Sequence, residues 1–385
     1  MKVAILAAEQ PGFVMPMANG LQKMLNAIGI TTEVFPQGLL MLNYSNSQPL
    51  KTLVKNTLKK MVNRVRPQRF LLQQGVTGDQ VSQFEKHLQS FDAIVVVCHI
   101  PDAFRADRLN RLEHIRQLNP TNSLKRPAIV LYQNYYLATR GHWYERIKAD
   151  GGFGLERYDW YFAASVTSDY PLSDDSHPVS LIGHNLGTDD LFVNDNKTEQ
   201  PFKVLLDFTR KGFEKYRELQ IEALEKTATP YYQLTGRYSL SEIRALYREH
   251  CALFLSFRES FGLPIVENQL CGNYIFAPYK SWTPSHYLAK PLSQAGEGEL
   301  GSNFRIYDHH LETLVKQIEH CRQNYQPQQL VANFTAQYPH LYQGDTQALH
   351  IFFAQLTSGD INAESHRQHV QLNQHIVGAI IQQKA

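Results

Sequence analysis

One stretch of the sequence constrains the fold more than any other, because it reads as a strand, a loop and a short helix in direct succession. Residues 251–255 are apolar and have the length of a buried parallel strand. Pro264 suits the first turn of the following helix, where its missing N–H costs nothing, and Gly272 suits the left-handed position just past the helix end. This succession predicts an α/β fold built on parallel sheets.

The loop of this unit is expected to expose a row of backbone donors. The N–H groups of residues 261–265 would lie unpaired at the positive end of the helix dipole. Two carboxylates flank them, Glu259 in the loop and Glu267 about one turn into the helix. Such a turn can hold an anion or a ring of hydroxyl groups. The alternative is that both acids are surface groups beside an ordinary buried turn.

Residues 259–267, Glu-Ser-Phe-Gly-Leu-Pro-Ile-Val-Glu, resemble the E-x7-E signature of retaining glycosyltransferases with the GT-B fold, which use nucleotide-activated sugars. The resemblance implies an α/β protein with two Rossmann-like, doubly wound domains facing each other across a cleft. It also implies that Glu259 contacts the donor sugar and that Glu267 accepts hydrogen bonds from the ribose hydroxyls. Backbone contacts to the donor would come from Phe261, Gly262 and Leu263.

The length of the chain predicts two domains, since 385 residues exceed the usual size of one, and 43% hydrophobic residues suffice for two cores. A polar run over 194–201 ends in proline and marks a linker. We therefore expect an N-terminal, acceptor-side domain over 1–196 and a C-terminal donor domain over 197–362. The last helix, within 363–385, is expected to pack back on the N-terminal domain, as the resemblance implies.

The C-terminal domain opens with a second candidate for anion binding. Residues 202–206 read as a strand, and a short loop with Arg210 and Lys211 leads from it into a helix. In the resembling family an arginine and a Lys-Gly pair at this place neutralise the donor diphosphate, which gives those roles to Arg210 and Lys211. In the resembling family, the backbone runs past the nucleotide base at the position of Gly236.

The first domain offers one candidate catalytic histidine. A buried strand over 92–98 ends at His99, and ligand groups gather beyond the carboxyl ends of parallel strands. A lone histidine at such a place is also often a hydrogen-bonded structural residue. The next strand ends at Gln133, where several retaining relatives carry a histidine, and an amide does not titrate near neutrality. Either His99 or His142 supplies the titratable imidazole, or no histidine is needed.

No cofactor is expected. The turn after the first strand contains Gly12 and Gly20 but no G-x-G-x-x-G, which argues against a nicotinamide or flavin site. It also lacks the Gly-Gly pair of many GT-B relatives. With Arg210, Lys211 and helix N-termini available for the diphosphate, no metal ion is required.

Composition excludes several classes of partner. The formal net charge of +2 indicates no global field for nucleic acid, and no run of eighteen apolar residues could span a bilayer. The amino terminus reads as a first strand rather than a signal peptide. The cysteines are scattered without the spacing of zinc ligands, which favours a reducing compartment and a cytoplasmic location. They are Cys98, Cys251, Cys271 and Cys321.

Residues 51–69 form a basic segment with seven cations, and no acidic residue occurs between Val34 and Gly78. Apolar residues recur within it at helical spacing, which predicts a basic amphipathic helix. Two interpretations remain. In the first, the helix makes a peripheral contact with an anionic surface, which is either lipid at the inner face of the membrane or an anionic glycan. In the second, its cations form the solvated face of a helix packed on the sheet.

The expected function is transfer of a hexosyl-type sugar from a nucleotide-sugar donor to a hydroxyl of a glycan, lipid-linked or protein acceptor. Retention of configuration, and a place in bacterial-type surface glycan or glycoconjugate synthesis, follow the resemblance. A GT-B-fold epimerase or phosphorylase shares the two-domain build. A non-catalytic nucleotide-sugar or glycan binder would keep Glu267 but could lose Glu259 or Lys211, and all three are present.

Overall fold

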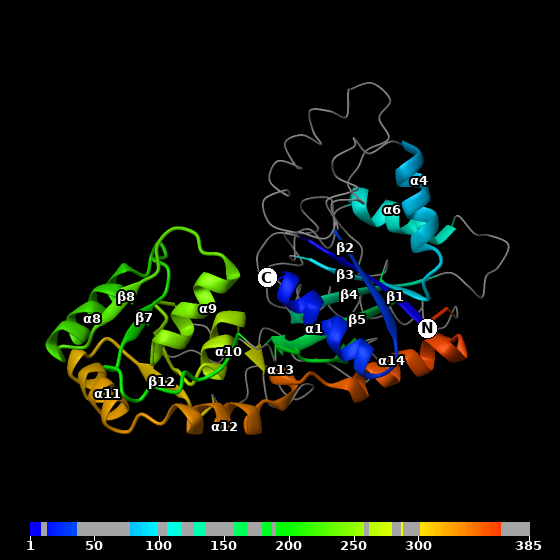
Figure 1. Ribbon diagram of the computed structural model, residues 1–385. Coiled ribbons are helices and arrows are strands. Elements are labelled where there is room, and N and C mark those ends of the chain that lie inside the picture. Colours follow the sequence, from blue (N-terminus) through cyan, green and yellow to red (C-terminus); the bar gives the residue numbers. More distant parts are fainter. Residues whose placement is uncertain are drawn as a thin grey trace, which may run out of the picture.

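The computed structural model of the chain contains two sheets with helices packed against them (Figure 1). The described residues are 1–8, 14–36, 78–98, 106–117, 127–135, 158–167, 179–186, 190–257, 262–278, 286–287 and 301–362. The basic segment 51–69 and the last segment, 363–385, lie outside them, so both expectations stay predictions.

The first sheet has seven strands, and all but one pairing in it are parallel. Its parallel part runs in the order β2-β1-β3-β4-β5-β6, and the short β11 adds antiparallel to β5. The strands are β1 (Lys2–Ala7), β2 (Thr31–Pro36), β3 (Ala93–Val97), β4 (Ala128–Tyr135), β5 (Trp160–Thr167), β6 (Val179–Leu181) and β11 (His286–Tyr287).

Both faces of this sheet are covered, because side chains alternate along each strand. In β1, Val3 and Ile5 enter one core with α1 (Val14–Ala27), whereas Ala4 and Leu6 enter another with the helices on the opposite face. Those helices are α4 (Gly78–Leu88) and α6 (Ala106–Gln117). The first half of the chain is therefore doubly wound, as expected.

The second sheet is wholly parallel and has five strands in the order β8-β7-β9-β10-β12. These are β7 (Val204–Leu206), β8 (Tyr231–Gln233), β9 (Ala252–Phe254), β10 (Tyr274–Pro278) and β12 (Phe304–Tyr307). Its helices are α8 (Glu214–Lys226), α9 (Leu240–Glu249), α10 (Leu263–Leu270), α11 (Leu311–Gln323) and α12 (Pro327–Gln337). Cores on its two faces contain, among others, Leu206 and Leu205 of β7, so it too is covered on both faces. The predicted α/β class with two parallel sheets is confirmed.

The chain returns to the first sheet earlier than the sequence suggested. After α13 (Pro339–Tyr342), helix α14 (Thr346–Ser358) packs on it, and a 3₁₀ turn (Asp360–Asn362) follows. The Phe352 ring lies 5.0 Å from that of Phe162 and 5.7 Å from that of Trp160, both in β5. This part of the range 197–362 thus packs against the first sheet, although we had assigned that range to the second domain.

The linker before the second sheet is fastened to the second domain. Lys197, which is buried, donates from Nζ to the carbonyl of Cys271 at 2.5 Å and to Oδ1 of Asn273 at 2.6 Å. Burial lowers the pKa of Lys197 to about 8, the largest effect on it. A boundary after residue 196 stays a prediction, but the residue that follows it is anchored beside the end of α10.

Gly272 occupies the left-handed position predicted for it, with φ +76°. A Cβ there would lie 2.6 Å from the Cβ of Pro327 and 2.8 Å from its carbonyl oxygen. Gly272→Ala should therefore lower the free energy of unfolding by roughly 2–4 kcal/mol, which combines left-handed strain with overpacking. Gly29→Ala is the matched control, since φ is +79° and nothing lies within 4 Å. Urea unfolding of both variants checks this, and equal losses would contradict the packing argument.

Candidate functional site

The order of strands in the second sheet creates one place where neighbouring connections diverge. The chain runs from β7 outward to β8 and then returns to β9 on the other side of β7. In open parallel sheets ligands bind beyond the carboxyl ends of the strands at such a switch point. Here the loops at that point are 207–213, after β7, and 255–262, after β9.

The strand, loop and helix over residues 251–272, called the organising stretch from here on, fold as predicted on both sides of the loop. Strand β9 is buried, and α10 begins at Leu263 with Gly262 as its N-cap residue and Pro264 in its first turn. Gly262 has no side chain with which to cap this helix end, and among the described residues no side-chain cap hydrogen bond is made there. Glu259 and Phe261 lie outside the described residues, and their roles stay predictions.

The cationic loop after β7 lies against the start of the organising stretch. The Arg210 guanidinium carbon is 3.3 Å from the centroid of the Phe257 ring, a cation–π contact. Phe257 is itself buried in the core of this face of the sheet. Arg210 and Lys211 are exposed, so two candidate phosphate-binding residues are presented beside the segment that leads into 258–261.

The N-terminus of α8 is partly occupied by the chain's own carboxylate. Gly212 donates its N–H to Oε1 of Glu214 at 3.0 Å. This hydrogen bond, followed by one from the Glu214 N–H, lowers the pKa of the Glu214 carboxyl. The sequence analysis did not anticipate this, although an acid in the first helical turn is a common capping signal.

Glu267 is buried, with its side chain 5% exposed, and pairs with an arginine that the sequence analysis did not single out. Arg244 of α9 donates to Glu267 Oε1 from Nη2 at 2.5 Å and from Nε at 3.2 Å. Burial raises the pKa of the Glu267 carboxyl, and Arg244 opposes that rise. An ionised, hydrogen-bonded carboxylate is the form that could accept ribose hydroxyls, so this pairing is compatible with the predicted role.

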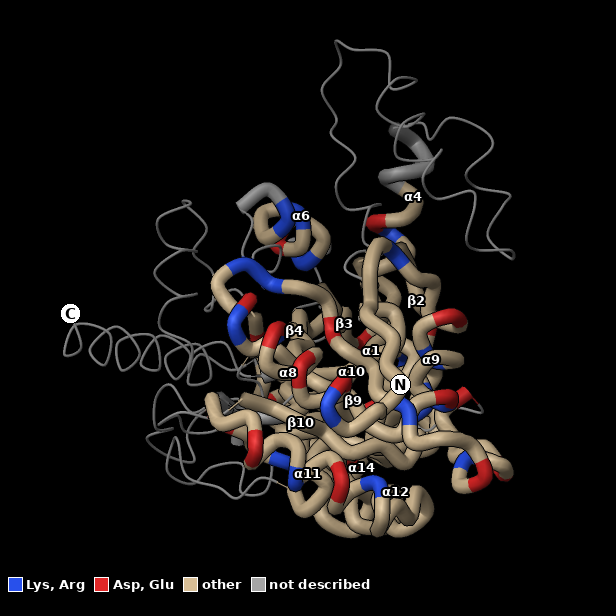
Figure 2. Tube along the Cα trace, turned by 90° about the vertical axis from the view of Figure 1, so that its left-hand side faces the viewer, with Lys and Arg blue, Asp and Glu red and all other residues tan. Residues whose placement is uncertain are grey.

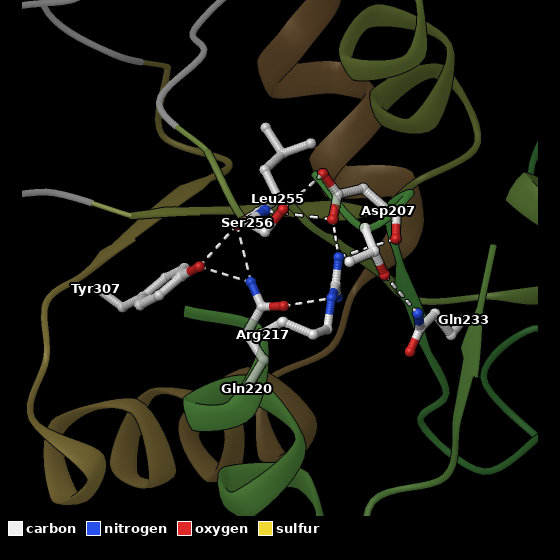
Figure 3. A network of polar contacts seen from close by, with 8 residues as sticks. Asp207, Arg217, Gln220, Gln233, Leu255, Ser256 and Tyr307 are labelled. Carbon is white, nitrogen blue, oxygen red and sulfur yellow. Dashed lines mark hydrogen bonds and ion pairs between the residues drawn. The ribbon is translucent and has the colours of Figure 1, made fainter. Parts of the chain in front are cut away.

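A buried polar network holds the bases of both loops together (Figure 3). Asp207, the first residue after β7, pairs with Arg217 of α8 and accepts from the Ser256 N–H and hydroxyl, each at 3.3 Å. Gln220 donates to the Leu255 carbonyl at 2.8 Å. The ends of β7 and β9 are therefore tied to one helix at the switch point.

The network has a second tier around Gln220. Its Oε1 accepts from Arg217 Nη1 at 2.6 Å, and its Nε2 lies 2.5 Å from the Tyr307 hydroxyl, which donates to the Leu255 carbonyl at 2.7 Å. Burial lowers the pKa of Arg217 to about 10, so the guanidinium stays charged at neutral pH. The guanidinium and the Asp207 carboxylate thus form a buried ion pair at the base of the candidate site.

Gly236 lies beyond the end of β8, at the same edge of the sheet, with φ +76° and no atom within 4 Å of a Cβ placed there. Around it, Tyr238 accepts from the Thr235 N–H at 3.1 Å, and its ring lies 6.1 Å from that of the exposed Phe208. A contact with a nucleotide base stays a prediction. Ser239 and Glu242 form a capping box at the start of α9.

In the first domain, Gln133 is buried and donates to the carbonyl of Cys98 at 2.7 Å. Its amide therefore fastens the end of β4 to the residue before His99. His99 and His142 lie outside the described residues, so a catalytic histidine stays a prediction.

Five of the predicted site residues thus follow carboxyl ends of strands in one sheet: Arg210, Lys211, Gly236, Gly262 and Leu263. Glu267 is the fifth residue of α10, the helix that begins at the same edge. Sequence reasoning missed Arg244, Arg217 and Gln220. Each is a polar residue of a helix that reads as solvated, and only its burial reveals a role.

The described residues show no concentration of metal-binding side chains and no membrane-spanning helix. Segments with Lys or Arg and segments with Asp or Glu are scattered along the described chain in Figure 2. In these same ranges, no three His, Cys, Asp or Glu side chains gather as metal ligands would. Nor does any helix within them have the length and apolar character needed to cross a bilayer.

No protein-family model matches the chain, and no curated protein matches it. Among solved structures it is similar to a UDP-GlcNAc 2-epimerase from Neisseria meningitidis bound to UDP-GlcNAc, with TM-score 0.48, 11% identity, and 93% of this chain and 100% of the other covered. It is also similar to an S. aureus MnaA structure with UDP, with TM-score 0.46, 10% identity, and 92% of this chain and 95% of the other covered. A third similar structure is an α-glucosyltransferase with UDP, with TM-score 0.45, 12% identity, and 93% of this chain and 100% of the other covered. Likeness of this degree carries no information on the substrate of this chain.

Proposed function

We propose that this protein transfers a sugar from a nucleotide-sugar donor to an acceptor hydroxyl, as a GT-B glycosyltransferase. The observation that supports it most is the meeting of two loops at the switch point of the second sheet. The contact of Arg210 with Phe257 brings the cationic loop to the segment that carries the E-x7-E signature. A cation pair, the N-terminus of α10 and the Glu267 carboxylate at one sheet edge suit a donor with a diphosphate, a ribose and a sugar.

The chemistry follows from charges that develop during transfer. The leaving diphosphate gains negative charge as the bond to the sugar breaks, and Arg210, Lys211 and the N-terminus of α10 would stabilise it. Glu259 would lie by the sugar, where positive charge develops on the ring, and Glu267 would orient the ribose. The proposal includes a reaction without a metal ion and with retention of configuration, both from the resemblance to the E-x7-E family.

The acceptor would bind on the side of the first domain, where His99 follows β3. A glycan, a lipid-linked sugar or a protein hydroxyl are the acceptor classes, in the making of surface glycans or glycoconjugates. We propose a cytoplasmic location, with residues 51–69 as the segment that would dock on an anionic surface.

A screen of nucleotides tests the proposed function. UDP, GDP and ADP are added to the protein and the melting temperature is followed, because a ligand at about 100 times its Kd stabilises by about 2.7 kcal/mol. We expect one nucleotide to raise the melting temperature and its sugar conjugates to be hydrolysed slowly without acceptor. Binding without any hydrolysis or transfer would indicate a non-catalytic binder, and epimerised donor would indicate an epimerase. If no nucleotide raises the melting temperature, the proposal is wrong.

A further inference from the structure

The Arg244–Glu267 pair is one-sided. A guanidinium and a carboxylate commonly meet as two forks, with one hydrogen bond to each oxygen. Here Nε and Nη2 of Arg244 both donate to Oε1 of Glu267, at 3.2 Å and 2.5 Å. No described residue donates a hydrogen bond to Oε2 of Glu267. One oxygen is thus used for holding the side chain, and the other is left for a ligand.

Arg244 is itself held from a second direction. Its Nη1 lies 3.6 Å from Oδ2 of Asp190, and Arg248, one turn further along α9, donates to the Asp190 carbonyl. Asp190 belongs to the segment that leads into the linker. Arg244 is buried, so a solvated surface pair does not describe it. Its position is set by the linker on one side and by α10 on the other.

The groups that face Glu267 are few. From α9 come Arg244 and Tyr247, from the linker side Asp190, and at the end of α10 Cys271. Burial raises the pKa of both the Tyr247 hydroxyl and the Cys271 thiol, so neither ionises near neutrality. Arg244 is therefore the cation among the described residues that opposes the rise in the pKa of the buried Glu267 carboxyl.

We propose that Arg244 is a positioning residue, which holds Glu267 ionised through Oε1 so that Oε2 accepts hydrogen bonds from the ribose hydroxyls of a bound nucleotide. This inference rests on the proposed function, because it takes a nucleotide as the ligand. Without Arg244 the pKa of the carboxyl would rise further, and the protonated form donates a hydrogen bond where the carboxylate accepts one. Arg244 contacts no ligand in this account and acts through Glu267 alone.

The test is calorimetric titration of the nucleoside diphosphate that stabilises the wild type, from pH 5 to pH 8. Arg244→Met should weaken binding about tenfold or more at pH 7, since a hydrogen bond to a charged group is lost. The pH below which affinity falls should move upward in that variant, because the pKa of Glu267 rises further without its cation. Arg244→Lys should restore part of the affinity, as it keeps the charge but not the fork.

Glu267→Gln and the double variant Arg244→Met/Glu267→Gln complete a double-mutant cycle of binding free energies. The double variant also serves where Arg244→Met alone fails to fold, because it buries no unpaired charge. In Glu267→Gln the nucleotide affinity should no longer fall at acidic pH through titration of a protein carboxyl. The fall caused by titration of the ligand phosphate should be the same in all variants. Glu249→Gln is the control, since Glu249 is an exposed carboxylate at the end of the same helix.

If the double variant binds as Glu267→Gln does, the inference holds. If it binds about tenfold or more weaker than Glu267→Gln, Arg244 acts by another route and the inference is wrong. Wild-type affinity and pH profile in Arg244→Met would also overturn it, with the proposed function intact. If no nucleoside diphosphate binds the wild type, both proposals are overturned.

Discussion

Exchange of Glu259 for glutamine is expected to lower kcat for sugar transfer by roughly 10²–10³, the cost of removing one preorganised electrostatic group from a reacting centre. Affinity for the nucleotide should change little, because the nucleotide is held by Glu267, Arg210 and Lys211 in this account. The matched control is Glu218→Gln, an exposed carboxylate on α8 away from the loops. Initial rates with the stabilising nucleotide's sugar conjugates, and calorimetric Kd values for the same variants, measure both effects.

The expectation for Glu259 depends on its place in the loop. Phe257 lies against Arg210, and Gly262 is the N-cap residue of α10. In the sequence Glu259 comes two residues after Phe257 and three before Gly262. Normal turnover in Glu259→Gln would remove this residue from the reaction, and a loss of nucleotide affinity equal to the loss of kcat would assign it to binding instead.

The organising stretch could be predicted because its signals are local. An apolar run specifies a buried strand, Pro264 specifies a first helical turn, and Gly272 specifies the left-handed end. The structure shows each of them. The capping box at Ser239 is of the same kind, since both partners lie within one turn.

The packing of α14 on the first sheet could not be predicted, for a different reason. Leu349, Phe352 and Phe353 have the spacing of an amphipathic helix, so a helix over this region could have been predicted. Which of two cores receives its apolar side is decided by Trp160 and Phe162, almost two hundred residues away in the sequence. Periodicity identifies an apolar face but not its partner.

The polar network was missed because nothing near Gln220 or Arg217 in the sequence marks them as buried. Helix α8 contains many charged residues, and most of them are exposed. Burial of these two follows from the ends of β7 and β9, which supply a carboxylate at Asp207 and a carbonyl at Leu255. Buried polar groups need partners, and partners contributed by separate strands become visible only in the fold.

Asp207→Ala is expected to lower the free energy of unfolding of the second domain by roughly 3–5 kcal/mol, the cost of leaving a buried charge without its partner. Asp207 pairs with Arg217 and accepts two hydrogen bonds from Ser256. The Arg217 Nε is already buried without a hydrogen-bond partner, so no spare acceptor is at hand to compensate. Urea unfolding followed by fluorescence and circular dichroism measures the loss, with Asp195→Ala, an exposed carboxylate of the linker, as control.

The double variant Asp207→Asn/Arg217→Met separates charge from packing. If the stranded guanidinium causes the loss, removing both charges should recover most of it, because buried ion pairs are often replaceable by uncharged groups of similar volume. The recovered protein should still bind nucleotide more weakly, since the loops after β7 and β9 have lost their shared anchor. A double variant as unstable as Asp207→Ala would show that the network stabilises through its hydrogen-bond geometry, and unchanged stability in Asp207→Ala would contradict the buried pair altogether.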